Sequence, residues 1–595
     1  MKKIKGLLFQ LLKGMSEAII RFPLTIVCLV GVATLVCYTI ALDQSPPIII
    51  EKLVYTFLVS AVLGMAAQFA VERFMKLSAL RLPVYGLALV LGAGYFLILW
   101  PVPEINAEIS VRTLIAVFAL ICAVLWIPAY KKKADFNEVC LIHFKTLFIS
   151  ILYSVVLSAG LAAIMASIDV LLFNIHHDAY SYMLTVVWIL FAPTYYLSLL
   201  PRFLSKTEDD VMKLQTAKNY PKFLSVLVSY IAIPLVGIYT LVLLAYFIKI
   251  LITWHWPSGQ LGPMVLIYSA AGLVILVLAS LLSNRFAVLY YKIFPKVLIP
   301  VVVLQLVSVG IRLNAYGVTE SRYYVALFGI FSIIIGVLLS IKPVTRNSMI
   351  ALLAAVLAIV SIIPPVDAFT VSRVSQINRL ERILASENIL SDGKIIPQAN
   401  ASEETKIETT NILNYLDRHS SLQYISWLPP DFQIYSDMKN VFGFDPTYPL
   451  DVAQDRYFVA VLDNQKPLII SGYDIGLTAF SYPGQEDQTY NFSLDGLNYV
   501  LNISRQSERE VSISVKDPAG TELIGTNLSE FAWKLKEEKK NNRESLAPDD
   551  MTLEIKKGEY KLKIVFQQIN LNFDDNKNDF MADYSMMIFF GHEKK

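Results

Sequence analysis

Cysteine is scarce in this chain of 595 residues and is confined to one end of it. The four cysteines are Cys28, Cys37, Cys122 and Cys140, and none follows in the rest of the sequence. A disulfide framework is therefore excluded for the C-terminal part, which must be held together by its hydrophobic core.

Charged residues are also few. Asp, Glu, Lys and Arg make up 17% of the chain, against 55% hydrophobic residues and a mean hydropathy of +0.53. This composition excludes a soluble multidomain protein and indicates a polytopic membrane protein. The lipid bilayer is therefore the first expected partner.

Basic residues outnumber acidic residues up to residue 365, and acidic residues outnumber basic residues beyond it. The first 365 residues contain 27 Lys and Arg against 14 Asp and Glu, a net charge of +13. The remaining residues contain 24 against 35, a net charge of −11. An acidic appended region lacks the basic surface that neutralises phosphates, so we expect no nucleic-acid partner.

The usual residue sets of enzymes and metal sites are missing as well. We find no Ser/His/Asp set, no glycine-rich phosphate loop and no paired zinc ligands. Cys140 and His143 have a spacing that occurs in metal sites, but no second pair lies nearby. Residues 574–579 resemble the start of a calcium loop but lack its glycine and its final glutamate. We predict no metal site, no catalytic residue and no cofactor, and lean against an enzyme.

What the sequence does contain is a series of long apolar segments. A spanning helix needs about 20 apolar residues to cross roughly 30 Å of hydrocarbon. Eleven segments qualify: residues 22–41, 53–71, 82–100, 111–127, 146–168, 180–200, 223–252, 264–282, 297–313, 324–341 and 348–363. The last would form only about 24 Å of helix, which leaves open whether it crosses fully.

Lys and Arg are distributed unequally between the loops that join these segments. One set of alternate loops holds 22 of them, whereas the other holds Lys52, Arg112, Arg312 and Arg322. Because basic loops stay in the cytoplasm, we predict a cytoplasmic N-terminus. Eleven crossings then place the C-terminal domain outside the cell membrane, and a disulfide-free outer domain favours a bacterium.

Beyond Pro364-Pro365 the chain becomes polar and changes its periodicity. Residues 371–390 repeat apolar positions with a period of 3.6, and a second helix is expected from Ser402, as its N-cap, to Arg418. From about residue 456 the period is two, as in the run 511–515. Short strands between turns predict an antiparallel β-sandwich, with a mobile loop over residues 534–550.

The predicted architecture is thus an α-helical polytopic membrane bundle of about 11 spans, residues 1–365, followed by an α+β extracytoplasmic domain. That domain contains a helical connector region, residues 366–450, and a β-rich region, residues 451–595.

One segment between the ninth and tenth apolar stretches concentrates polar and aromatic side chains. Its candidate substrate- or partner-binding residues are Arg312, Tyr316, Gly317, Thr319, Glu320, Arg322 and Tyr323. Ionisable groups near the membrane are costly and need a partner or a wet cavity. Glu320 could pair with Arg312 or Arg322, which would leave one guanidinium to hold an anionic group. The alternative is a tight turn, with Gly317 supplying the backbone angle and the charges reaching the interface.

The pattern Tyr316-Gly317-x-Thr319-Glu320-x-Arg322-Tyr323 resembles the signature of a bacterial integral-membrane family, domain of unknown function 4153. The resemblance covers most of the membrane half. Residues 390–394 (LSDGK) and 427–430 (WLPP) are similar to the extracytoplasmic tails of Gram-positive members. The resemblance implies a multi-pass membrane protein with no established activity.

Three functional hypotheses follow from these features, and the one with the least support is a membrane-embedded transferase that acts on a lipid-linked donor at the outer face with Glu320 as its general base. In the first, a non-enzymatic envelope protein uses the bundle to anchor an outward-facing domain that binds or senses an envelope component or a partner membrane protein. In the second, the protein is a transporter or flippase of an anionic amphipathic substrate. Pro193, Pro234 and Pro300 would then interrupt helices around the substrate site, and Arg312 and Arg322 would attract its head group.

Overall fold

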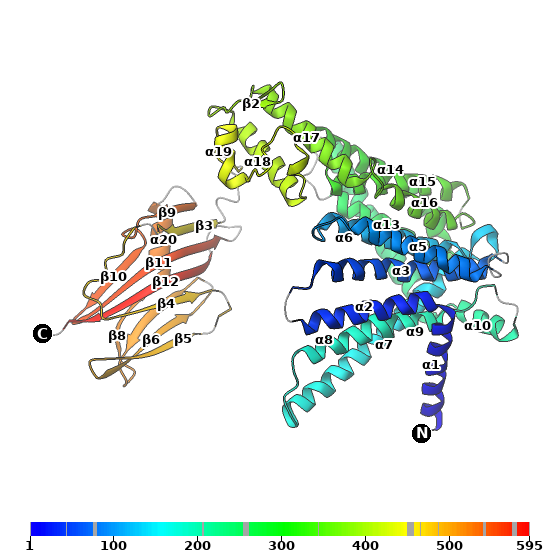
Figure 1. The fold of residues 1–595 in the computed structure, drawn as a ribbon, viewed down its shortest axis with the longest axis horizontal. Coiled ribbons are helices and arrows are strands. Elements are labelled where there is room, and N and C mark those ends of the chain that lie inside the picture. Colours follow the sequence, from blue (N-terminus) through cyan, green and yellow to red (C-terminus); the bar gives the residue numbers. More distant parts are fainter. Residues whose placement is uncertain are drawn as a thin grey trace. The chain divides into compact units, whose positions relative to one another are not determined.

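The structure is a computed structural model in which the chain divides into two compact units, Met1–Thr447 and Tyr448–Lys595 (Figure 1). It describes residues 2–42, 45–74, 80–204, 207–253, 261–342, 344–448, 457–463, 466–482, 484–485, 487–507, 509–538, 543–573 and 580–593. The boundaries proposed at residues 365 and 450 stay predictions, and the two units are described in turn.

The first unit begins with a helical bundle built from the apolar segments. Its helices are α1 (Lys2–Arg21), α2 (Pro23–Ala41), α3 (Ile48–Arg73), α5 (Arg81–Leu99), α6 (Ala107–Trp126), α7 (Phe136–Leu171), α8 (Asp178–Thr185), α9 (Ala192–Leu199), α10 (Glu208–Lys218), α11 (Lys222–Val226), α12 (Ile233–Thr253), α13 (Leu261–Ala279), α14 (Arg285–Tyr316), α15 (Glu320–Ile341) and α16 (Ser348–Val360). A 3₁₀ turn, η1 (Tyr130–Lys132), precedes α7. Neighbouring helices such as α2, α3 and α5 run side by side (Figure 1).

Within the described ranges, ten helical runs are long and apolar enough to cross a membrane. This confirms the predicted class of helical membrane bundle. The eleventh predicted segment forms α16, which has 13 residues and is about 20 Å long at 1.5 Å per residue. That length falls short of the roughly 30 Å hydrocarbon layer, so a full crossing by this segment stays a prediction.

Two of the runs contain a wider helical turn just before a proline. The π-helical segments η2 (Val186–Phe191) and η3 (Leu227–Ala232) precede Pro193 and Pro234. Proline lacks the N–H that would bond to the carbonyl four residues earlier, and its ring crowds that carbonyl. The widened turn accommodates both effects, as is usual where an α-helix is interrupted.

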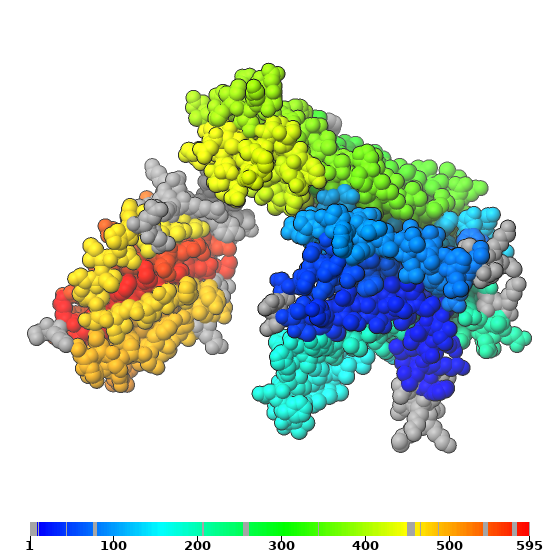
Figure 2. Space-filling view, in the orientation of Figure 1, coloured from blue at the N-terminus to red at the C-terminus, as the bar shows by residue number. Residues whose placement is uncertain are grey.

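The bundle continues directly into three shorter helices, α17 (Ala368–Ser386), α18 (Glu403–Arg418) and α19 (Ile434–Phe442). The two-residue strands β1 (Leu390–Ser391) and β2 (Lys394–Ile395) form a hairpin between α17 and α18, and a 3₁₀ turn, η4 (Leu422–Tyr424), follows α18. Figure 2 shows these helices gathered into one body beside the helices that precede them in the chain. The Ser402 hydroxyl accepts a hydrogen bond from the Thr405 amide at 3.3 Å, which confirms the predicted N-cap.

The second unit consists mainly of two sheets. Its strands are β3 (Tyr457–Leu462), β4 (Ile475–Ser481), β5 (Gln488–Leu494), β6 (Leu497–Arg505), β7 (Val511–Lys516), β8 (Glu522–Asn527), β9 (Arg543–Leu546), β10 (Thr552–Lys557), β11 (Tyr560–Phe573) and β12 (Phe580–His592). In the described residues one sheet has the order β4-β12-β11-β3-β9, with β10 also paired to β11, and the other has the order β5-β6-β7-β8. Both sheets are antiparallel apart from the parallel pair β3–β9.

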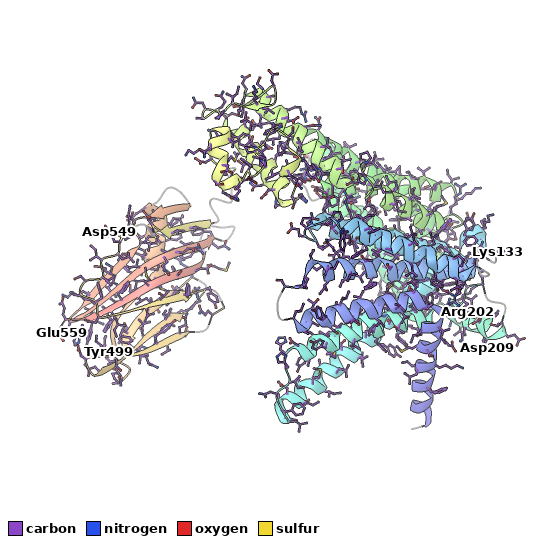
Figure 3. All side chains as sticks on the ribbon, viewed as in Figure 1. Lys133, Arg202, Asp209, Tyr499, Asp549 and Glu559 are labelled. Carbon is purple, nitrogen blue, oxygen red and sulfur yellow. The ribbon has the colours of Figure 1, made fainter. Side chains whose placement is uncertain are left out.

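A single hydrophobic core joins the two sheets. Tyr499 of β6, labelled in Figure 3, is 2% exposed and lies 5.3 Å from the Phe590 ring of β12, measured between centroids. Alternate residues of β7, such as Val511 and Val515, are fully buried, as their period of two predicts. The β-rich fold is therefore confirmed.

The mobile loop predicted over residues 534–550 is partly wrong. Helix α20 (Leu528–Glu538) and strand β9 occupy part of this stretch. The Phe531 ring stacks on Phe566 with centroids 5.0 Å apart, and Trp533 lies 5.5 Å from Phe580. Packing of these two half-buried aromatic rings against the core holds a helix where the local composition favours a loop.

Candidate functional site

The candidate residues surround the turn between α14 and α15. Helix α14 ends at Tyr316 and is capped by Gly317, which has a φ of +69° and whose amide bonds to the Leu313 carbonyl at 3.0 Å. A Cβ at this position would lie 2.9 Å from the Gln376 side-chain nitrogen and 3.2 Å from the Ser375 hydroxyl. Glycine is thus required both for the backbone angle and for the close approach of α17.

Helix α17 supplies hydrogen bonds to the backbone of this turn. The Gln376 amide nitrogen donates to the Tyr316 carbonyl at 3.0 Å and to the Val318 carbonyl at 2.8 Å. The Ser375 hydroxyl accepts from the Val318 amide at 2.9 Å. Backbone groups that the end of α14 leaves unpaired are therefore satisfied by the first helix after the bundle.

Glu320, at the start of α15, contacts α18. The Tyr415 hydroxyl donates to its Oε1 at 2.6 Å, and His419 Nε2 lies 3.8 Å from its Oε2. Burial, followed by the hydrogen bond to this carboxylate, raises the pKa of Tyr415 well above its ordinary value. The Tyr415 hydroxyl therefore keeps its proton and serves Glu320 as a donor.

The predicted ion pair of Glu320 with Arg312 or Arg322 is not found among the described residues. Arg322 instead donates from Nη1 to the carbonyls of Tyr316 and Gly317, at 3.2 and 2.8 Å. Its Cζ lies 5.5 Å from the centroid of the Tyr316 ring. Because the guanidinium caps the end of α14, where the helix dipole is negative, the carboxylate turns to α18.

The other candidates divide between the turn and its surroundings. Tyr316 is 48% exposed, and the Arg379 guanidinium, which is paired with Glu408 at 2.6 Å, also lies near its ring. Thr319 precedes α15, and its hydroxyl lies 3.3 Å from that of Ser321. In the described part of the chain, Arg312 has no hydrogen bond or ion pair.

A second set of contacts fixes the N-terminal end of α17. The Tyr323 hydroxyl donates to the Val366 carbonyl at 2.7 Å. Asp367 is fully buried, caps α17 by accepting from the Phe369 and Thr370 amides, and pairs with Arg112 of α6 at 2.7 Å. Sequence reasoning used Arg112 only as a loop charge, because nothing local to it points to a partner 255 positions away.

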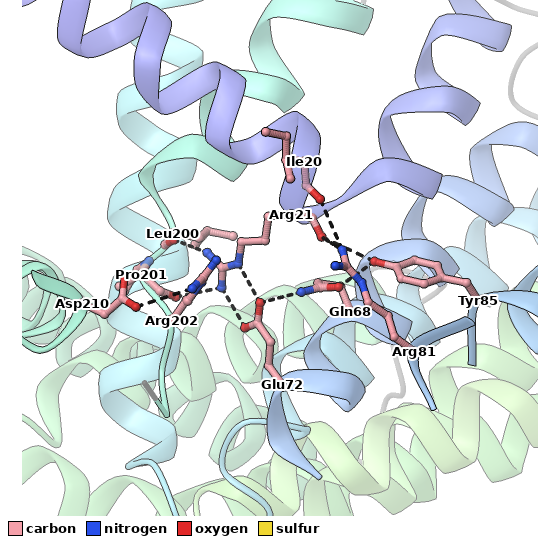
Figure 4. Close-up of polar contacts among 10 residues, drawn as sticks. All are labelled: Ile20, Arg21, Gln68, Glu72, Arg81, Tyr85, Leu200, Pro201, Arg202 and Asp210. Carbon is pink, nitrogen blue, oxygen red and sulfur yellow. Dashed lines mark hydrogen bonds and ion pairs between the residues drawn. The ribbon is translucent and has the colours of Figure 1, made fainter. Parts of the chain in front are cut away.

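Sequence reasoning also missed a polar network at the junction of α1 and α2. Arg21 forms a two-pronged ion pair with Glu72 of α3, with distances of 2.8 and 2.9 Å (Figure 4). It also donates to the carbonyls of Leu200 and Pro201, while Gln68 links Glu72 to the Tyr85 hydroxyl. This network ties the start of the bundle to α3, α5 and the end of α9.

No group of three or more His, Cys, Asp or Glu side chains arranged to hold a metal occurs in the described ranges. His143 Nδ1 lies 2.5 Å from the Tyr196 hydroxyl, and His176 Nδ1 lies 3.1 Å from Asp178 Oδ2. Residues 574–579, which resemble part of a calcium loop, lie outside the described residues.

In the part of the chain that the structure describes, ten helical runs of membrane-spanning length are followed by a β-rich unit, which defines a multi-pass membrane protein with an appended domain. Residues 30–395 match the family described as Domain of unknown function (DUF4153), and the chain belongs to this family. The matched range includes the α14–α15 turn and α17 but ends before Tyr415.

An uncharacterised protein of Pasteurella multocida (strain Pm70) is 25% identical to this chain over 221 residues. The alignment covers 37% of this chain and 37% of that relative. No solved structure matches.

Proposed function

We propose that this protein is a non-enzymatic component of a bacterial cell envelope, in which the membrane bundle anchors an outward-facing domain that binds or senses an envelope component or a partner membrane protein. The contact of Glu320 with α18 carries the proposal. This carboxylate is the one ionisable acid of the family-like motif, and its Oε1 accepts from Tyr415 at 2.6 Å. A carboxylate held in this way by the appended helices joins two parts of the chain and is poorly placed to act as a general base.

Three sets of contacts support a mechanical connection between the bundle and helices α17 and α18. Gln376 and Ser375 bind the backbone of the α14–α15 turn, Tyr415 binds Glu320, and Asp367 binds Arg112. A ligand that displaces α17 or α18 would have to disturb these contacts. The motif then acts as a coupling element between the bundle and helices α17 and α18, and Arg322 positions the carbonyls of Tyr316 and Gly317.

The outward orientation rests on the charges of the loops, 22 Lys and Arg on one side against four on the other. A reporter that is active only after export, fused after Lys595, tests it. We expect activity from this fusion and none from a reporter that works only in the cytoplasm. The reverse pattern would place the domain inside and refute the proposal.

Binding is tested by co-purification from mild detergent. Full-length protein is compared with a variant that ends at Thr447 and with the variant Tyr415→Phe. We expect specific envelope partners to be lost with the truncation and weakened by Tyr415→Phe. If the truncated protein recovers the same partners and supports the same cellular phenotype, the binding role of the domain is wrong.

A second proposal, a transporter or flippase of an anionic amphipathic substrate, is favoured by two other observations. The π-helical turns η2 and η3 interrupt two spans before Pro193 and Pro234, and such turns often mark functional sites. Arg312 offers a guanidinium with no hydrogen bond or ion pair within the described residues. Vesicles containing the protein should then move a fluorescent anionic lipid between leaflets, and Arg312→Gln should slow this movement. If the lipid moves between leaflets no faster than in empty vesicles, the transporter or flippase proposal is wrong.

A further inference from the structure

A large apolar cavity lies within the helical bundle. Its volume is about 760 Å³, and it is lined by residues of α3, α6, α7, α9, α13, α15 and α16. Along α13 the lining extends from Leu266 to Leu278, which corresponds to about 18 Å of helix. All these elements except α16 belong to helical runs of membrane-spanning length and composition. The cavity therefore lies at the depth of the hydrocarbon layer.

The wall of the cavity is partly exposed at the surface of the bundle. Phe118 of α6, Leu147 of α7 and Val274 of α13 all line it, and they are 49%, 50% and 53% exposed. In a membrane, exposed apolar side chains at this depth face lipid chains. The cavity thus opens sideways towards the bilayer, and its volume is that of a site for one medium-sized ligand.

The polar side chains of His143, Tyr196, Tyr324 and Ser361 interrupt the apolar lining, and both His143 Nε2 and the Tyr324 hydroxyl lack a hydrogen-bond partner in the described residues. His143 is 6% exposed, and its Nε2 has no hydrogen-bond partner among the residues that the structure describes. Its Nδ1 lies 2.5 Å from the Tyr196 hydroxyl, which has no other acceptor there. The Tyr196 hydroxyl can donate its proton only to His143 Nδ1, which must then be the unprotonated ring nitrogen. A neutral imidazole of this kind carries its hydrogen on Nε2. An unsatisfied N–H in such surroundings is costly, so it calls for an acceptor.

We propose that the cavity binds one acyl lipid, with its hydrocarbon chain along α13 and a carboxyl or ester carbonyl oxygen accepting a hydrogen bond from His143 Nε2. Such a lipid can enter from the bilayer through the sideways opening. Its hydrocarbon chain then exchanges contacts with neighbouring lipid chains for contacts with the apolar wall of the cavity. A carbonyl oxygen satisfies the remaining ring nitrogen. This site is independent of the proposed binding role of the appended domain, because it uses residues of the bundle alone.

Photolabelling of the unaltered full-length protein tests the location of the site. The probe is palmitic acid with a diazirine in its chain, added to protein in detergent and located by mass spectrometry of peptides. We expect label on the stretches of α6, α7 and α13 that line the cavity, and its displacement by unlabelled palmitate. Label spread evenly over the exposed faces of all spans would overturn the proposal.

Matched variants test occupancy. Ala354 of α16 lines the cavity, whereas Ala163 of α7 is exposed and does not. Ala354→Phe should lower the labelling at least about tenfold, a change of 1.4 kcal/mol in binding free energy. Ala163→Phe should leave it unchanged. A thermal unfolding scan of each variant separates loss of the cavity from loss of the fold, and full labelling of folded Ala354→Phe would contradict the site.

The polar contact has its own test. His143→Phe keeps a ring but removes the donor, whereas His143→Gln retains an N–H. We expect His143→Phe to weaken labelling by the palmitic acid probe but not by a diazirine alkane without a carboxyl group, and His143→Gln to restore part of it. Equal labelling of wild type and His143→Phe by both probes would refute the role of His143.

Discussion

The helical bundle and the β-rich unit place their apolar side chains in opposite ways. In the β-rich unit, Phe566, Ile564 and Met586 are fully buried in one continuous core. In the bundle, Leu82 is 84% exposed and Val170 is 80% exposed. The difference reflects the solvent, because water drives apolar area inward whereas a lipid chain is as apolar as leucine.

The interior of the bundle accordingly contains side-chain hydrogen bonds that join one helix to another. Asn347 donates to the Asn137 side chain at 2.6 Å and to the Ser280 hydroxyl at 2.9 Å, and Asn284 donates to Ser229 at 2.7 Å. Small and polar residues let helices approach closely and bond to one another inside a membrane. Hydrophobic burial therefore stabilises one unit, and close packing with a few polar bonds stabilises the other.

The largest expected effect comes from the core of the β-rich unit. Phe566→Ala removes a fully buried ring that contacts Phe531 and Tyr584, and should lower the free energy of unfolding by about 3–5 kcal/mol. Val170→Ala, on the lipid-exposed face of α7, should change it by less than about 0.5 kcal/mol. Pulse proteolysis of the full-length protein in urea measures both, and similar losses in the two variants would contradict the comparison.

The next effect concerns a buried charge where the bundle joins α17. Arg112→Gln leaves the fully buried Asp367 without its cation and should cost about 3 kcal/mol. Lys439→Gln breaks a pair with Asp445 whose side chains are 69% and 68% exposed, and should cost less than about 1 kcal/mol. Hydrogen exchange of amides 368–386 reports the change, and equal exchange in the two variants would mean that Asp367 does not depend on Arg112.

A smaller effect is expected for the contact between Glu320 and Tyr415. A double-mutant cycle with Glu320→Gln and Tyr415→Phe should give a coupling free energy of about 1.5–3 kcal/mol, the range for a hydrogen bond to a charged group. Tyr424→Phe, at a ring that is 55% exposed, serves as the control and should show no coupling with Glu320→Gln. Zero coupling for Tyr415 would remove the connection on which the proposed function rests.

The smallest effect depends on pH at the start of α18. Hydrogen bonds from the Ser402 hydroxyl and amide favour the ionised form of Glu387 and lower the pKa of this carboxyl below its ordinary value of 4.5. The contribution of ionised Glu387 to the stability of the fold is present above pH 4.5 and is lost as the pH falls through the lowered pKa. Amides 403–406 should therefore lose protection from exchange below pH 4.5 in the wild type. Glu387→Gln should lack this pH dependence, and an identical pH profile would assign it to another group.

The sequence could predict features that arise between near neighbours. Ser402 caps α18 through a bond to an amide three positions later, and the alternation of Val511, Ile513 and Val515 fixes which face of β7 is buried. The apolar segments predict membrane helices because length and composition alone decide whether a helix can span the hydrocarbon. At the candidate site, the tight-turn alternative expected an unusual backbone angle at Gly317, and the φ of this residue is positive.

The partners of the motif were settled only by the tertiary structure. Glu320 was expected to pair with an arginine of its own segment, but its carboxylate meets Tyr415, 95 positions away, and Arg112 meets Asp367 across 255 positions. Periodicity tells which face of a helix is apolar, but it does not tell which helix will lie against it. The amino-acid sequence by itself thus determined the spans, the caps and the strand faces, because these depend on bonds and burial over a few residues. Helix packing decided which charges meet, because a buried carboxylate takes whichever donor the neighbouring helix brings within reach.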